Sequence, residues 1–125
     1  MIEKDEMLEL AVIACPSFKP VWEEFLDEWK DEKDLPLYLA LGDLSRHISS
    51  LVETAQDSEL KELFEVVERW HIEGSPYVKE AATIALLEGL QDQSNAASTE
   101  GYLLPESKKW WDKVNGFWEN GTLIM

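Results

Sequence analysis

Residues 57–91 read DSELKELFEVVERWHIEGSPYVKEAATIALLEGLQ, and this stretch decides the fold class. Its first half carries apolar residues at the three- and four-residue spacing of one helix face. These residues are Leu60, Leu63, Phe64, Val67 and Trp70. Gly74 then stops the helix and Ser75-Pro76 starts another, because serine caps a helix N-terminus and proline suits its first turn. The second helix is apolar over most of its circumference, which is typical of a central helix.

Helical spacing also appears outside this pair, and no segment alternates cleanly like a β-strand. It predicts helices over about 3–14, from about 20 onward, over about 37–55 and over about 105–121. The helix from about 20 carries a stripe of aromatic residues that we expect to face the core. This stripe consists of Phe18, Trp22, Phe25 and Trp29.

We therefore expect one all-α domain over residues 1–125, a single compact bundle of about six helices. The pair at 57–91 has the layout of one HEAT-type unit and would lie at the centre of the bundle. Because one such unit cannot bury a continuous core alone, the other helices would close the bundle around it. The polar stretch 92–104 predicts a mobile surface loop.

The net negative charge of the chain limits the classes of partner that it can bind. The chain has 26 Asp and Glu against 11 Lys and Arg, a formal net charge of -15 in 125 residues. Such a chain repels nucleic acid and anionic membranes, and it attracts basic proteins. No apolar run approaches the roughly 18 residues of a membrane span. With a single cysteine, no intramolecular disulfide can form, and we expect a cytoplasmic protein.

Motifs for catalysis, cofactors or metals are absent from the sequence. There is no glycine-rich phosphate loop, nucleophile elbow or calcium loop. Cys15, His47 and His71 lie far apart in the chain and outside any metal-ligand spacing, so we expect no metal and no cofactor. We interpret Cys15 as a buried thiol, because nothing nearby in the sequence activates it as a nucleophile. The chain is therefore predicted not to be an enzyme, although an unrecognised site stays as a third alternative.

The remaining candidates are carboxylates on the polar sides of two predicted helices. Their phase places them outward, where they could pair with Lys and Arg of a partner. The predicted partner-binding carboxylates are Asp27, Glu28, Asp31, Glu59, Glu62 and Glu65.

Three segments carry a resemblance to known proteins: residues 15–29 (CPSFKPVWEEFLDEW), 78–82 (VKEAA) and 103–112 (LLPESKKWWD). Together they resemble a family of small acidic all-helical bacterial proteins. Some members look like immunity proteins encoded beside polymorphic toxins of the Rhs or contact-dependent kind. The family often has glycine before the proline of the last segment, where this chain has Leu104. The resemblance implies a helical fold and a toxin-neutralising partner interaction; it carries over no binding residues, because such proteins neutralise different toxins.

The leading hypothesis is a non-enzymatic binding domain that captures a basic protein, most concretely an immunity protein that covers the active site of a secreted toxin domain. The alternative is an adaptor or scaffold subunit that docks a partner, or dimerises, through its last helix. That helix carries two tryptophan stripes that can hardly both be buried, and Trp111 is the residue predicted to contact the partner.

Overall fold

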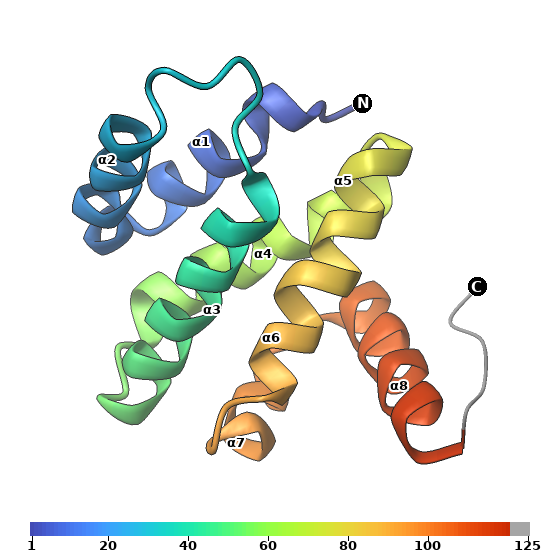
Figure 1. Cartoon of the computed structure of the whole chain (residues 1–125). Coiled ribbons are helices and arrows are strands. Elements are labelled where there is room, and N and C mark those ends of the chain that lie inside the picture. Colours follow the sequence, from blue (N-terminus) through green and yellow to red (C-terminus); the bar gives the residue numbers. More distant parts are fainter. Residues whose placement is uncertain (121–125) are drawn as a thin grey trace.

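A computed structural model describes residues 1–120 of the chain, with side chains for residues 1–116 (Figure 1). The elements are α1 (Lys4–Ala14), η1 (Pro16–Phe18), α2 (Lys19–Glu28), α3 (Leu37–Glu53), α4 (Asp57–Glu73), α5 (Pro76–Glu80), η2 (Ala81–Leu87), α6 (Glu88–Gln91), α7 (Ala96–Glu100) and α8 (Pro105–Asn120). The described residues contain no extended strand, and the expectation of an all-α bundle is confirmed. The likeness of its central pair to a HEAT unit stays a prediction.

Elements α5, η2 and α6 form one continuous helix through the middle of the bundle, with a π-helical segment at η2 (Figure 1). It packs against α3, α4 and α8. Ala81, Ala82, Leu86 and Leu87 are fully buried, so the prediction of a central helix packed on several sides is confirmed. Its small residues allow the close approach: a Cβ added at Gly89 would lie 2.9 Å from the Ser45 hydroxyl oxygen on α3.

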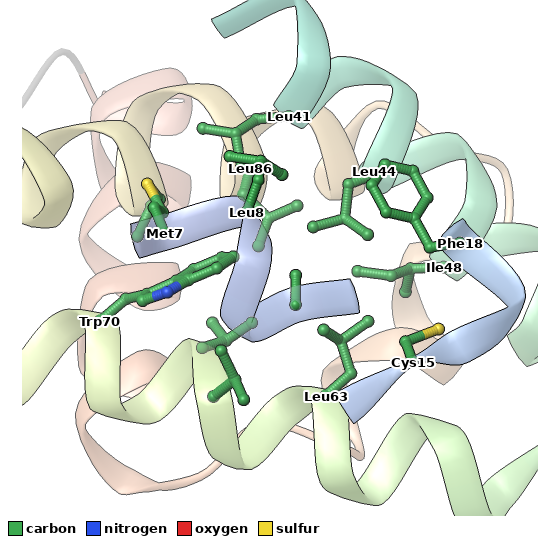
Figure 2. Close-up of a cluster of buried hydrophobic side chains, with 14 of the residues drawn as sticks. Met7, Leu8, Cys15, Phe18, Leu41, Leu44, Ile48, Leu63, Trp70 and Leu86 are labelled. Atoms are coloured by element: carbon green, nitrogen blue, oxygen red, sulfur yellow. The ribbon is translucent and has the colours of Figure 1, made fainter. Parts of the chain in front are cut away.

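The core joins α1, α3 and α4 around side chains such as Leu8, Leu41, Leu63 and Trp70 (Figure 2). The aromatic stripe of α2 enters this core only in part. Phe18 and Phe25 are buried as predicted, whereas Trp22 and Trp29 are half-buried against its edge.

The structure differs from the expectation at residues 92–104, which were predicted as a loop. Residues 96–100 form helix α7, in which Thr99 is fully buried. The segment is tied to α3, because the Asn95 amide donates to the Ser49 carbonyl at 2.9 Å and the Ser49 hydroxyl donates back at 2.7 Å. Polar side chains of this segment therefore form specific hydrogen bonds within the protein. Composition alone does not show whether a polar side chain bonds to protein or to water.

Gly74, at the turn between α4 and α5, is required for space. Its φ is -70°, so any residue could adopt the backbone conformation. A Cβ there would lie 2.3 Å from the Trp70 carbonyl oxygen and 2.7 Å from a methyl of Val78. The turn also holds the N-terminus, since the Ile2 N–H donates to the Glu73 carbonyl and the Ser75 N–H donates to the Ile2 carbonyl, both at 2.8 Å.

Replacing Gly74 with alanine is therefore expected to lower the free energy of unfolding by about 2 kcal/mol or more, because the buried backbone must shift to admit a methyl group. Gly116→Ala is the matched control: no atom of the described side chains lies within 4 Å of its Cβ position, and alanine favours a helix by about 1 kcal/mol. Urea unfolding of both variants measures the difference. Equal stabilities would contradict the steric role of Gly74.

Candidate functional site

An apolar groove runs between α1 and α4, and two of the predicted carboxylates border it. Its apolar lining comes from both helices and comprises Leu10, Ile13, Ala14 and Val66. Ile13 is 75% exposed there, more than any other large apolar side chain in the described part of the chain except Met1. Glu62, Glu65 and Arg69 line the remainder of the groove. The groove thus combines an apolar surface with two exposed carboxylates.

The carboxylates predicted on the second helix lie elsewhere. Asp27 and Glu28 are exposed on α2, and Asp31 is exposed just beyond its end. Asp27 pairs with Lys30 on the surface at 3.6 Å, which reduces its availability. None of these three lines the α1–α4 groove. The structure therefore separates the predicted acidic residues into an α2 set and an α4 set.

Glu59 does not belong to the groove either. Its carboxylate accepts a hydrogen bond from the Cys15 thiol at 2.9 Å and another from the Ser17 hydroxyl. Ser17 also lies 2.8 Å from Nε2 of His47. Four polar side chains from α1's end, η1, α3 and α4 thus form one cluster, named here the Cys15–His47 cluster. Sequence reasoning placed Glu59 on an outer face and missed the cluster, because its members are separated by up to 44 residues.

The environment of the cluster changes the pKa values of its members. Burial, together with the hydrogen bond to Glu59, raises the pKa of the Cys15 thiol to about 11. The hydrogen bonds from Cys15 and Ser17 lower the pKa of Glu59. Burial lowers the pKa of His47, and the charge of Glu59 opposes that effect. Near neutral pH Cys15 is therefore a protonated donor and a poor nucleophile.

Glu68 holds α8 onto α4. Its carboxylate accepts from the backbone N–H groups of Glu106 and Ser107 at 2.9 and 2.8 Å, at the start of α8 where such groups lack partners. The Ser107 hydroxyl also donates to Glu68 at 2.8 Å and lies 3.3 Å from Nδ1 of His71. His71, Ser107 and Thr83 are buried. This network explains the Pro-Glu-Ser start of the last helix as a docking feature.

The partner contact predicted for Trp111 is wrong for this structure. Trp111 is only 2% exposed, and its indole N–H donates to Glu100 at 3.0 Å. Trp110 is the half-buried member of the pair, and the ammonium groups of Lys109 and Lys113 lie 5.6 and 4.4 Å from its ring centre. Helix periodicity placed Trp110 and Trp111 on different faces of α8, but it did not show which face packs against α4 and η2. The side chains of Phe117 and Trp118, on the same helix, lie outside the described residues.

Comparison with known proteins assigns a family. The model of a domain of unknown function, DUF7674, matches residues 8–119. The chain belongs to this family. No curated protein and no solved structure matches the chain. Because the match spans α1 to α8, the groove, the Cys15–His47 cluster and the Glu68 network all lie within the DUF7674 domain. Within residues 1–120, no helix is both long and apolar enough to span a bilayer.

Ser107→Ala is expected to lower the free energy of unfolding by about 1–2 kcal/mol, because it removes a hydrogen bond to the charged carboxylate of Glu68, whereas His71 keeps its contacts with Val67 and Thr83. Ser98→Ala, at an exposed position on α7, is the control and should change it by less than about 0.5 kcal/mol. Chemical denaturation compares them, and equal effects would contradict a structural role for Ser107.

Acidification is expected to weaken the fold through the same network. Burial lowers the pKa of His71. Burial alone would raise the pKa of Glu68, but the hydrogen bonds from Glu106 and Ser107 outweigh it and lower that pKa. Both groups bind protons more readily in the unfolded chain, so stability present near neutral pH is lost as the pH falls, below about 6.5 for His71 and below about 4.5 for Glu68. Denaturation curves across this range should have a smaller pH slope in His71→Gln; an unchanged slope would contradict this assignment.

Proposed function

We propose that this DUF7674 protein is a non-enzymatic binding domain that captures a basic protein in the α1–α4 groove, and that it serves as an immunity protein for a toxin. The observation that carries the proposal is the exposed Ile13 beside Glu62 and Glu65 in one groove. Apolar contact supplies most of the affinity in protein interfaces, and carboxylates select partners with Lys or Arg.

The charge of the chain supports a basic partner. The whole chain carries a formal net charge of -15, so its field attracts cationic surfaces at long range. Arg69, the cation lining the groove, forms an ion pair with Glu73 at 3.0 Å and so contributes little free positive charge there. An amphipathic segment with Lys or Arg beside apolar residues matches both components of the groove. Enzymes that bind phosphates keep such basic surfaces, which makes nuclease-like toxins suitable targets.

The groove can be tested with an amphipathic peptide of leucine and lysine by isothermal titration calorimetry. Ile13→Ser should lower its affinity about tenfold or more. Ile72→Ser is the matched control, because Ile72 is 58% exposed on α4 but does not line the groove. Both variants should keep their stability within about 0.5 kcal/mol, since both positions are exposed. Equal loss of affinity in the two variants would show that the peptide binds without using the groove.

The double reversal Glu62→Lys with Glu65→Lys should weaken the same peptide and flatten the salt dependence of its affinity, because screening no longer acts on an attractive pair. Glu53→Lys with Asp92→Lys makes an equal change in net charge at exposed positions outside the groove, on α3 and after α6. This control variant should lose much less affinity for the peptide. A loss of equal size would mean that net charge alone determines binding.

Protection of cells tests the immunity role itself. The product of a toxin-sized reading frame directly beside the gene should stop growth when expressed alone, and co-expression of this protein should restore growth. Protection should fail in the Glu62→Lys, Glu65→Lys variant and persist in the Glu53→Lys, Asp92→Lys control. A neighbouring product that is harmless, or whose toxicity this protein does not reduce, would refute the immunity role.

A further inference from the structure

The Cys15–His47 cluster brings three kinds of metal ligand to one place. Cys15 follows the last residue of α1, His47 lies within α3, and Glu59 lies in the first turn of α4. Helices α1 and α3 both pack on α4, and η1 packs on α1, so the backbone fixes where the side chains start. Figure 2 shows Cys15 near Leu63 at the edge of the buried cluster. The cluster therefore lies where the core meets the surface.

Distances in the cluster are close to those of a coordination shell. One ligand atom each of Cys15, His47 and Glu59 lies within 4.8 Å of the other two. In a tetrahedral zinc site, bonds of 2.0–2.3 Å place neighbouring ligand atoms roughly 3.4–3.6 Å apart. The thiol and the carboxylate are already 2.9 Å apart, so they must separate slightly while the imidazole moves inward. Changes of about 1 Å are within the reach of side-chain torsions.

We propose that Cys15, His47 and Glu59 together bind a zinc ion. Thiolate, imidazole and carboxylate form a ligand set that zinc accepts, whereas calcium and magnesium prefer oxygen alone. Binding forms a bond between Sγ and the metal as the thiol proton leaves to solvent, and the metal replaces the hydrogen bond between Cys15 and Glu59.

The exposed side of the cluster leaves a fourth position. Ser17 is exposed, and its hydroxyl contacts both His47 and Glu59. Zinc held by three protein ligands takes a water or an added donor in the fourth position. The Ser17 hydroxyl lies within hydrogen-bonding distance of Cys15, His47 and Glu59, so its side chain must rotate aside to admit the ion and is then a neighbour of the bound water rather than a ligand. The site shares no residue with the lining of the α1–α4 groove, so its failure leaves the proposed partner interaction unaffected.

Titration of chelator-treated protein with Co²⁺ and then Zn²⁺ tests the site. Co²⁺ should give a thiolate charge-transfer band and the intense visible bands of tetrahedral coordination, with one ion per chain, and Zn²⁺ should remove both signals. Competition with a colorimetric chelator gives the zinc affinity. Each of Cys15→Ala, His47→Gln and Glu59→Gln should lower that affinity by about 100-fold or more, beyond the effect typical of outer-shell residues.

Two controls separate this site from unspecific binding to an acidic protein. Glu62→Gln changes an exposed carboxylate on the same helix and should keep the affinity. Ser17→Ala should keep the cobalt spectrum tetrahedral, since Ser17 is not a ligand. Because Cys15 is fully buried and its variant could misfold, His47→Gln at a half-buried position decides the outcome in that case. Absence of the charge-transfer band, or an equal loss in Glu62→Gln, would overturn the proposal.

Discussion

The burial of the central helix, from α5 through η2 to α6, is the interaction on which the rest of the bundle depends. Ala81, Ala82, Leu86 and Leu87 are fully removed from solvent between α3, α4 and α8. Small residues on this helix let backbones approach closely, as Gly89 does against Ser45. Because interiors are packed as densely as organic crystals, this contact sets where α3 and α4 lie relative to each other. Every candidate site described above lies on α3, α4 or a helix packed on them.

Helix α4 illustrates how one helix distributes its carboxylates among different roles. Glu59 accepts hydrogen bonds in the Cys15–His47 cluster, and Glu68 caps α8. Glu62 and Glu65, between them, remain exposed at the groove. All four carboxylates contribute equally to the net charge, so the net charge does not distinguish their roles. Neighbouring residues give Glu68 a structural role and make Glu59 a potential metal ligand, whereas Glu62 and Glu65 remain free to contact a partner.

The groove and the Cys15–His47 cluster are both consequences of α1 packing on α4. The apolar side of α1 that faces the core buries Leu8 and Ala11, while Ile13 stays exposed beside α4 and lines the groove. At the end of α1, Pro16 breaks the helix and turns the chain into η1, which brings Cys15 and Ser17 beside Glu59. A binding surface and a polar cluster thus arise from one helix–helix contact.

Helix periodicity and the positions of proline and glycine predicted the helices, because these signals act over a few residues. The sequence predicted a helix that begins near Asp57 and ends before Gly74, close to the observed α4, and it identified the apolar central helix and the excess of negative charge. Which of the outward residues remain free depends on how the helices pack. The tertiary structure buried Trp111 rather than Trp110, gave α7 to a stretch predicted as a loop, and joined Cys15, His47 and Glu59 across 44 residues. The physical reason is that helix faces follow from local spacing, whereas their neighbours follow from packing among residues distant in the chain.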